Sequence, residues 1–348
     1  MPGAAILPSR NEPATIAAVT AAVDSALGDP RALIIHADSS DDPTTNERFN
    51  ATQTRARKLS LTSLPRGKGA QILAALAHLP DTDGPLLIAD TDTRNPDPVV
   101  YGELLAQGDH GFAIADYPRY WDEANLTSHL ARPLIAAATG HDIPQPLAGD
   151  LALSAGVIRT VREAADALEA QLRLAVEGYG IDAFLLLTAA RTGRTSSVTV
   201  QAPKMHAASF PHLPQIYDQA VPVLLALTAN WPRNPAPGPP APPYRPAHRT
   251  LDPRRRATML STLNTLAPPH SHYDSCPWTQ ALAHAWHSAR NGASPHRAAR
   301  ALWPHYVHRV RAWLTAKTPP AERAGQLALA HTQLCATLTA SAARSRIT

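Results

Sequence analysis

The sequence has few of the residues that mark a protein held together by covalent or metal cross-links. Only two cysteines occur in 348 residues, Cys276 and Cys335, and they form no C-x-x-C pair. This scarcity argues against a disulfide framework and against a cysteine metal site. Apolar runs are short as well, since none approaches the ~18 residues that a membrane-spanning helix requires. The N-terminal stretch lacks a basic segment followed by an apolar core of signal-peptide length. We therefore expect a soluble, cytoplasmic protein with no membrane partner.

Aromatic residues are also scarce, at 5% of the chain, and the basic residues are dispersed rather than clustered. The formal net charge is only +4, and no known nucleic-acid-binding motif is present. We expect no nucleic-acid partner. A mildly basic surface is instead compatible with an anionic small ligand such as a nucleotide. The hydrophobic content of 44% is sufficient for most of a chain of this length to fold around a core.

Strand patterns alternate with helix patterns through the first two thirds of the chain. Apolar strand signals occur at residues 4–7, 32–37, 86–92, 110–117, 149–155 and 196–203, and helical spacing follows several of them, including residues 16–27, 72–79, 125–140, 157–176 and 213–229. Polar loops collect at the ends of the strands. This alternation predicts a mainly parallel α/β sheet with a Rossmann-like arrangement, whose ligands bind at the carboxyl ends of the strands.

The remainder of the chain has a different composition. Prolines dominate residues 231–249, which can form neither a helix nor a central strand, and helical patterns without strand signals fill residues 250–348. We predict a catalytic domain over residues 1–230, a proline-rich linker or strap over 231–249, and a helical C-terminal region over 250–348.

An apolar strand meets two acids in the stretch "PLLIADTDTRNPDP", which places Asp90 and Asp92 one residue apart. A single Asp-x-Asp is weak evidence, because acids after strands are often helix caps or solvated loop residues. The position of this motif at the predicted ligand edge of the sheet strengthens the case for a functional role. Two carboxylates in this spacing can bind Mg²⁺ or Mn²⁺, which in turn bridges the phosphates of a nucleotide.

A glycine loop opens the helix whose apolar spacing covers residues 72–79. In "RGKGA", Lys68 stands between two glycines at a helix start, where free backbone N–H groups and the helix dipole favour a phosphate. The loop lacks the G-x-x-x-x-G-K-[ST] spacing of a P-loop, so a P-loop NTPase is not expected.

Several segments in this order resemble one enzyme family. They are "ILPSRNEPATI", "HADSSDD", "LPRGKGAQILAAL", "IADTDTRNPDP", "ARPLIAAATGHDIPQPLAGDLALS", "GYGIDAFLLL" and "KMH", and "ALWPHYVHRV" resembles the helical tail of the same enzymes. The family is that of retaining GT-A glycosyltransferases of the glucosyl-phosphoglycerate synthase and mannosylglycerate synthase type. The most specific match is "QPLAGD" after "ARPL", with "GYGID" downstream.

The resemblance implies a role for particular residues of this chain. The residues implied to bind the nucleotide-sugar donor are Pro8, Ser9, Glu12, Asp38, Ser39, Lys68, Asp90, Thr91 and Ala148. Those implied to take part in transfer, or to line the strand edge beside the sugar, are Asp182, Leu147, Gly149 and Lys68. The implied metal ligands for Mg²⁺ or Mn²⁺ are Asp90, Asp92 and His206. The implied acceptor-binding residues are Asn125, Thr127 and Tyr179.

The sequence departs from this family in the segment that binds the acceptor. Relatives that use phosphoglycerate read "GRVTE" where this chain has "ANLTS", so Asn125 replaces the arginine that grips an anionic acceptor. Ala207 and Ala208 also replace a basic residue and an asparagine. A buried phosphate or carboxylate would be poorly compensated without those donors. We therefore expect a different small hydroxylated acceptor, such as a neutral or cationic specialised metabolite.

The function predicted from the sequence is the retaining, metal-dependent transfer of a hexose from a nucleoside diphosphate sugar. UDP-glucose is the first choice of donor and GDP-mannose is the second. No residue pattern identifies a nucleophile. The group that deprotonates the acceptor is not identified either, and Asp182 and Asp150 are candidates. Two alternatives also stay open. A sugar-phosphate nucleotidyltransferase would use similar parts, but its glycine-rich signature is absent from "LPSRNEP". A catalytically silent homologue would bind the nucleotide sugar without turnover. Family resemblance further implies a homodimer.

Overall fold

The computed structural model describes residues 3–79, 84–206, 209–232, 243–267 and 277–344. The chain divides into two compact units, of which unit 1 comprises residues 1–117 and 147–208 and unit 2 comprises residues 118–146 and 209–348. This division differs from the boundary that we predicted at residue 230, because residues 118–146 and 209–230 group with the helical C-terminal region. Most of the predicted proline-rich linker, residues 233–242, lies outside the described residues.

Unit 1 is built on a seven-stranded sheet in the order β3-β2-β1-β4-β6-β5-β7. Its strands are β1 (Ala4–Ser9), β2 (Leu33–Asp38), β3 (Arg57–Leu61), β4 (Leu86–Ile88), β5 (Gly111–Asp116), β6 (Leu151–Leu153) and β7 (Arg194–Thr199). All neighbouring pairs are parallel except those of β6, which runs antiparallel to both β4 and β5. The mainly parallel sheet predicted from the sequence is therefore confirmed.

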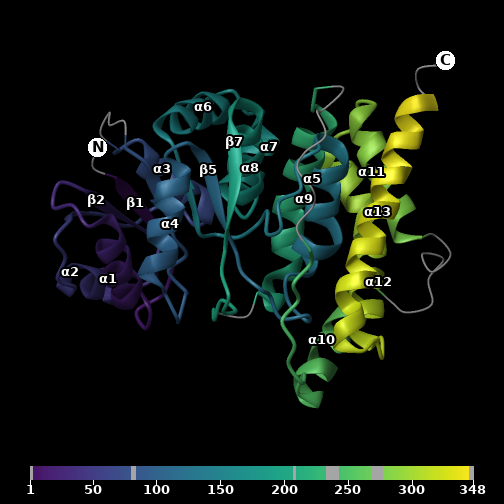
Figure 1. Cartoon of the computed structure of the whole chain (residues 1–348), viewed down its shortest axis with the longest axis horizontal. Helices are drawn as coiled ribbons and strands as arrows, with labels where there is room; N and C mark the ends of the chain where they lie inside the picture. The colour runs from purple at the N-terminus through teal and green to yellow at the C-terminus, as the bar shows by residue number, and fades with distance from the viewer. Residues whose placement is uncertain (1–2, 80–83, 207–208, 233–242, 268–276, 345–348) are drawn as a thin grey trace. The chain divides into compact units, whose positions relative to one another are not determined.

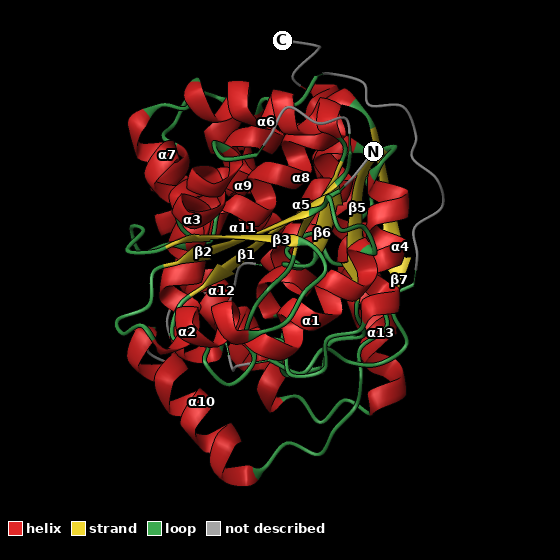
Figure 2. Ribbon diagram, turned by 90° about the vertical axis from the view of Figure 1, so that its left-hand side faces the viewer, coloured by secondary structure: helices red, strands yellow, loops and turns green. Residues whose placement is uncertain are grey.

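Helices cover both faces of this sheet (Figure 2). One face carries α1 (Ile16–Leu27) and α4 (Pro98–Gly108), with α2 (Thr44–Ala51) beside α1, and the other carries α3 (Lys68–Leu76), α6 (Ala155–Asp166), α7 (Ala170–Glu177) and α8 (Ile181–Thr192). The strands bury both faces, so β1 and β5 are buried along their whole length and read as continuous apolar runs. Figure 1 shows the elements in chain order from purple to yellow.

The register of the sheet brings distant residues to one edge. Ser9 at the end of β1 pairs with Asp38 at the end of β2, and Ile6 pairs with Ile88 of β4. The loop after β4 therefore emerges beside the end of β1, where the Thr91 hydroxyl donates to the Pro8 carbonyl at 2.7 Å. Because β6 is antiparallel, the residues that precede it reach this same edge. Asp90 and Asp150 thus meet, with the Asp90 N–H donating to Asp150 Oδ1 at 2.9 Å.

One helix predicted from the sequence is interrupted. The apolar spacing predicted a single helix over residues 157–176, but α6 ends at Asp166 and α7 begins at Ala170. The Arg173 guanidinium donates to the carbonyls of Ala165 and Asp166, which satisfies the exposed end of α6 and makes the break possible. The elements α2, β3 and α4 were not predicted. The strand β3 is an edge strand whose side chains are only partly buried, so it has no clear apolar signal.

The regular secondary structure of unit 2, within its described residues, consists of helices, apart from an isolated bridge between Tyr120 and Ala247. Its elements are the π-helix η1 (Thr127–Ala131), α5 (Arg132–Thr139), the 3₁₀-helix η2 (Phe210–His212), α9 (Leu213–Ala229), α10 (Pro253–Leu266), α11 (Trp278–Arg290), α12 (Pro295–Thr315) and α13 (Pro320–Arg344). Within the described part of the chain, no helix is both long and apolar enough to cross a membrane.

Candidate active site

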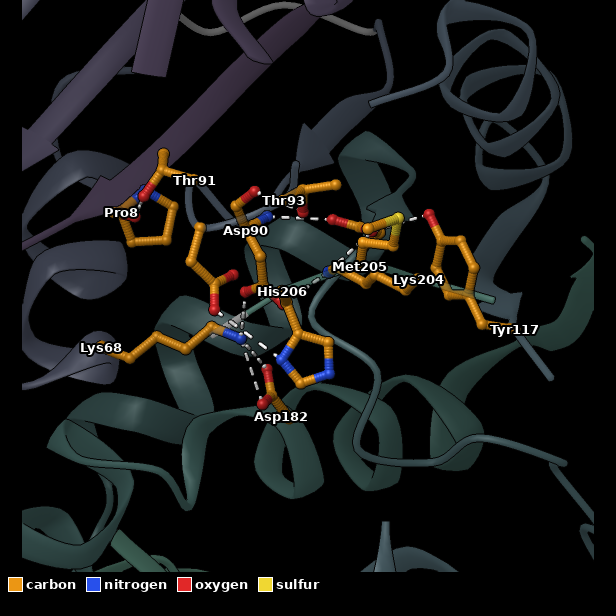
Figure 3. A network of polar contacts seen from close by, with 12 residues as sticks. Pro8, Lys68, Asp90, Thr91, Thr93, Tyr117, Asp182, Lys204, Met205 and His206 are labelled. Atoms are coloured by element: carbon orange, nitrogen blue, oxygen red, sulfur yellow. Dashed lines mark hydrogen bonds and ion pairs between the residues drawn. The ribbon is translucent and has the colours of Figure 1, made fainter. Parts of the chain in front are cut away.

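Asp90 stands between two lysine ammonium groups at the sheet edge of unit 1 (Figure 3). Its Oδ1 lies 2.9 Å from Lys68 Nζ, and its Oδ2 lies 2.8 Å from Lys204 Nζ. Burial alone would raise the pKa of this carboxyl, but the two ammonium groups outweigh burial and hold the pKa of Asp90 well below its usual range. Asp90 is therefore a carboxylate whose charge is already balanced by protein cations.

A second layer of side chains lies behind Asp90. Lys204 Nζ lies 2.8 Å from Asp150 Oδ2 as well as from Asp90, and the Tyr117 hydroxyl donates to the same Asp150 oxygen at 2.8 Å. The side chain of Lys204 is only 1% exposed and that of Asp150 is fully buried. These groups contact other protein groups and do not face solvent, so they support the site rather than form its surface.

Lys68 also contacts a second acid, which comes from the start of α8. Its ammonium lies 2.9 and 3.1 Å from the two carboxylate oxygens of Asp182. Burial lowers the pKa of Lys68, but Asp182 and Asp90 more than offset this effect and the net shift is upward. Burial raises the pKa of Asp182 to about 6, with Lys68 opposing the shift. At neutral pH the three groups form a charged acid–lysine–acid bridge.

Asp92 and His206 lie beside this charge network. Asp92 Oδ2 lies 3.9 Å from His206 Nδ1, and their side chains are 29% and 16% exposed. Burial and the nearby carboxylate of Asp90 raise the pKa of Asp92. The described residues contain no group of three or more His, Cys, Asp or Glu side chains arranged to hold a metal ion. A cation bound between Asp92 and His206 would therefore take its remaining ligands from a substrate or from water.

Three glycines allow the close approaches on which the site depends. A Cβ at Gly149 would overlap the carboxylate of Asp90. A Cβ at Gly67, where φ is +134°, would overlap the Glu177 carbonyl, and one at Gly69 would overlap that of Val176. The Gly69 N–H donates to the Gly178 carbonyl at 3.1 Å. The glycine loop is thereby fixed against the turn between α7 and α8, which sets Lys68 opposite Asp182.

A polar cluster occupies the carboxyl ends of β1 and β2. Asp38 Oδ1 accepts hydrogen bonds from the Ser9 hydroxyl at 2.9 Å and from both the N–H and the hydroxyl of Ser40, at 3.0 and 2.6 Å. The Ser9 hydroxyl lies 2.6 Å from His36 Nε2, and burial lowers the pKa of His36. Gln71 donates to the Ser39 hydroxyl at 2.6 Å. These bonds hold Asp38 with one oxygen saturated, which leaves Oδ2 for a further donor.

Glu12 begins the loop that leads into α1. Its N–H donates to the Thr45 hydroxyl at 3.1 Å, and Thr15 donates to its carboxylate at 3.3 Å. Burial, followed by the charge of Asp92, raises the pKa of Glu12 to about 7. A carboxylate in this environment would be stabilised by hydroxyl donors of a ligand.

The structure groups most, but not all, of the residues that the sequence pointed to. In unit 1, contacts join Lys68, Asp90 and Asp182, as well as Asp92 with His206, Thr91 with Pro8, and Ser9 with Asp38. Leu147, Ala148, Ser39, Glu12 and Tyr179 are also in unit 1. Asn125 and Thr127 lie in unit 2, so the structure does not test the grouping of the acceptor residues.

Sequence reasoning missed Lys204 and the role of Asp150 in holding Asp90. Lys204 was visible only as the first letter of "KMH", where we singled out the histidine. A lysine in a loop is normally exposed, and its burial depends on two acids that lie 114 and 54 residues away in the sequence. Only the meeting of these loops in three dimensions reveals the ion pairs.

Comparison with known proteins supports the fold. No family model and no curated protein matches the sequence. The structure is similar to that of glucosyl-3-phosphoglycerate synthase from Mycobacterium tuberculosis in complex with Mn²⁺, uridine diphosphate and phosphoglyceric acid, with 24% identity, a TM-score of 0.51, and coverage of 66% of this chain and 79% of the other. The complex of that enzyme with Mn²⁺ and UDP-glucose gives the same four values. A further mycobacterial protein matches with a TM-score of 0.50 at 22% identity, over 66% of this chain and 75% of that one.

At this level of identity the matches bear on the fold and not on the reaction. The chain has the GT-A fold of the glycosyltransferases that it resembles, as the sequence predicted.

Proposed function

We propose that the protein is a retaining, metal-dependent glycosyltransferase that moves a hexose from a nucleoside diphosphate sugar to a small hydroxylated acceptor. The observation that carries the proposal is the grouping of Asp92, His206 and Lys68 around Asp90 at the ligand edge of a GT-A sheet. Structures of a GT-A enzyme with this fold contain Mn²⁺ together with UDP or UDP-glucose. The charges in the site are compatible with the departure of a nucleoside diphosphate whose negative charge is stabilised by a metal ion.

The residues present fit a divalent cation. Asp92 has a raised pKa and lies near a histidine, so a cation between them would stabilise the carboxylate form. Carboxylate oxygen and imidazole nitrogen together suit Mn²⁺, and a Mg²⁺ ion would rely more on phosphate and water oxygens. We propose Asp92 and His206 as the protein ligands. Asp90, whose oxygens both contact lysines, would act by orienting Lys68 rather than by direct ligation. When bound, the cation would neutralise charge on the nucleoside diphosphate.

The nucleoside would lie over the cluster at the ends of β1 and β2. Asp38 has one saturated oxygen and presents Oδ2 as a single acceptor, which matches the single N3–H donor of uracil. Guanine would present two adjacent donors, N1–H and N2–H, and would be better served by two free carboxylate oxygens. This argument favours UDP-glucose over GDP-mannose. Glu12, with its raised pKa, would accept hydrogen bonds from ribose hydroxyls.

Lys68 and Asp182 would serve the diphosphate and the sugar. The Lys68 ammonium lies at the amino end of α3, where it and the helix dipole both favour phosphate oxygens. When Lys68 turns toward the diphosphate, Asp182 would exchange its cation for sugar hydroxyls. Retention of configuration is part of the proposal through the family resemblance. In that scheme Lys68 stabilises the departing phosphate oxygen, which helps to deprotonate the acceptor.

The acceptor would not be phosphoglycerate. Asn125 is buried, and its amide N–H donates to the Asp122 carbonyl at 3.1 Å, while its Oδ1 has no hydrogen-bond partner. An unpaired carbonyl oxygen would bind a hydroxyl or ammonium donor, and it would repel a phosphate or carboxylate. A neutral or cationic hydroxylated metabolite is therefore the proposed acceptor class.

The first experiment is a thermal-shift panel of UDP-glucose, UDP-N-acetylglucosamine, GDP-mannose and the free diphosphates, each with Mn²⁺ or with chelator. A metal-dependent rise in Tm with a uridine ligand, lost in Asp92→Ala and kept in the exposed control Asp109→Asn, is expected, because a ligand that binds only the native state stabilises it by mass action. Incubation with acceptor mixtures should then release nucleoside diphosphate. Pyrophosphate release would instead indicate nucleotidyl transfer, and binding without turnover would indicate a silent homologue.

The proposal includes assembly as a homodimer in the cytoplasm. Light scattering coupled to size-exclusion chromatography should give a mass near twice that of the 37.2 kDa chain. A mass equal to one chain at micromolar concentration would contradict this part of the proposal and leave the catalytic part intact.

A further inference from the structure

The segment Lys204–His206 lies outside regular secondary structure, and the side chain of its first residue is buried. It follows the end of β7 at Thr199 and precedes η2. The Lys204 ammonium is inserted between Asp90 and Asp150, at 2.8 Å from an oxygen of each, and lies 5.6 Å from the centre of the Tyr117 ring. In Figure 3 the label of Lys204 lies on the side of Tyr117, and the His206 ring lies on the side of Lys68 and Asp182.

Backbone contacts join the same segment to the loop that follows Asp92. The Arg94 N–H donates to the Met205 carbonyl at 2.8 Å, and the Met205 N–H donates to Asn95 Oδ1 at 2.8 Å. The Asn95 amide also donates to the Pro203 carbonyl at 3.2 Å. The two loops therefore run side by side, and the ion pairs of Lys204 anchor one end of their junction.

We propose that Lys204 is a positioning residue, whose buried ion pairs with Asp90 and Asp150 bring His206 to Asp92 and so assemble the cation site. The consequence for the substrate rests on the proposed function. The positioning of His206 by Lys204 does not depend on the proposed function, because it concerns only how two loops pack against each other. A buried lysine with no solvent contact cannot reach a nucleotide, so its effect on binding must pass through the residues that it holds.

A purely structural role for Lys204 predicts a different outcome. Suppose that Lys204 served only to neutralise Asp150. Removal of both charges would then restore the stability, the nucleotide affinity and the Met205 exchange rate that removal of Lys204 alone had changed. The double variant Lys204→Met/Asp150→Asn separates the two roles. It keeps the charge balance of the network. The amide oxygen of an asparagine at position 150 can still accept from the Asp90 N–H, and its amide N–H can donate to the hydroxyl oxygen of Tyr117.

The experiment compares wild type, Lys204→Met, the double variant and the exposed control Lys317→Met. Two quantities are measured: the Kd of UDP with Mn²⁺ by titration calorimetry, and the hydrogen-exchange rate of the Met205 amide without ligand. We expect Lys204→Met to be destabilised. The double variant should have a Tm close to that of wild type. It should nevertheless bind Mn²⁺ and UDP at least tenfold more weakly than Lys317→Met, and its Met205 amide should exchange at least tenfold faster than in that control.

Recovery of Tm together with a Kd within twofold of the control and unchanged exchange at Met205 would overturn the proposal. If wild type bound no Mn²⁺ and UDP, the proposed function would fail, and the exchange rate of the Met205 amide would still decide the positioning role. If Lys204→Met did not fold, Lys204→Arg would provide the test. It keeps the charge, but its planar guanidinium does not reproduce two contacts from a single nitrogen, so faster exchange at Met205 is expected there as well.

Discussion

The carboxylate of Asp90 lies directly against the bare Cα of Gly149. This contact exists because Gly149 precedes the antiparallel strand β6, whose start reaches the same sheet edge as the end of β4. The position of Asp90 determines in turn where Lys68 and Lys204 place their ammonium groups. The absence of one side chain therefore shapes the whole charge network.

Gly149→Ala should displace Asp90 and damage the site. The added methyl would overlap the carboxylate, and overpacking of this kind costs about 1–3 kcal/mol of stability. We expect a lower free energy of unfolding in urea and a loss of metal-dependent nucleotide binding. Gly102→Ala is the matched control, since nothing lies within 4 Å of its added Cβ. That helix-interior change should raise stability by roughly 0.5–1 kcal/mol. Equal effects of the two substitutions would contradict the argument.

The two acids of the Asp-x-Asp motif should respond differently to replacement by asparagine. Asp92→Asn removes a carboxylate whose raised pKa shows that its charge is costly in the fold, so stability should be kept or improved. Its transfer activity should fall by at least about 100-fold, because a bound cation supplies several kcal/mol of charge stabilisation.

Asp90→Asn, in contrast, leaves Lys68 and Lys204 short of a counter-charge. Loss of one partner from a buried ion pair costs about 3–5 kcal/mol. Denaturant unfolding should therefore show a large loss of stability. The Mn²⁺ affinity of the folded fraction should fall less than in Asp92→Asn, because the amide oxygen can still accept from Lys204. The reverse pattern, in which Asp90→Asn is stable but loses the metal, would assign the cation to Asp90.

Glu12 should make stability depend on pH in a direction opposite to that of a salt-bridged acid. Its pKa is raised from 4.5 to about 7 in the fold, so the native state binds more protons than the unfolded chain between these values. The native state therefore loses stability as the pH rises through this window, and the full penalty is present above pH 7. Glu12→Gln should be more stable than wild type at pH 8, by about 1 kcal/mol after allowance for partial exposure, and equal to it at pH 4. Urea unfolding at both pH values tests this, and a difference independent of pH would contradict it.

Asp38→Asn should reduce the preference for uridine. The asparagine can keep one acceptor oxygen but brings an amide donor to the face that would meet the base, and loss of a charged hydrogen bond costs about 1.5–3 kcal/mol. The Kd for UDP should rise by roughly tenfold or more, since 1.4 kcal/mol corresponds to a factor of ten. Calorimetric titration of UDP and GDP against both proteins measures the change. Equal weakening for the two nucleotides would argue against base recognition by Asp38.

Asn125→Arg should shift the acceptor range toward anions. The substitution introduces the guanidinium that phosphoglycerate-using relatives carry at this position, and a guanidinium binds phosphate or carboxylate through paired hydrogen bonds. We expect phosphoglycerate to be used poorly by wild type and measurably by the variant, in an assay of nucleoside diphosphate release. Efficient use of phosphoglycerate by wild type would overturn the proposed acceptor class.

The sequence alone was sufficient for the features that depend on local pattern. Continuous apolar runs in β1, β4 and β5 indicated a buried sheet, because strands covered on both faces have no polar side. Polar residues directly after those runs, such as Asp38 and Asp90, indicated the ligand edge, because parallel strands end on the same side. The glycines beside Lys68 indicated a tight helix start, and the structure shows why no larger residue fits there.

The tertiary structure decided which charges meet. Lys204 is an ordinary loop lysine in the sequence, and only the packing of loops after β4 and β7, with the start of β6, buries it between Asp90 and Asp150. The break between α6 and α7 likewise depends on an arginine that reaches back to the preceding helix. Ion pairs and caps of this kind join residues by distance in space, and no periodicity along the chain encodes that distance.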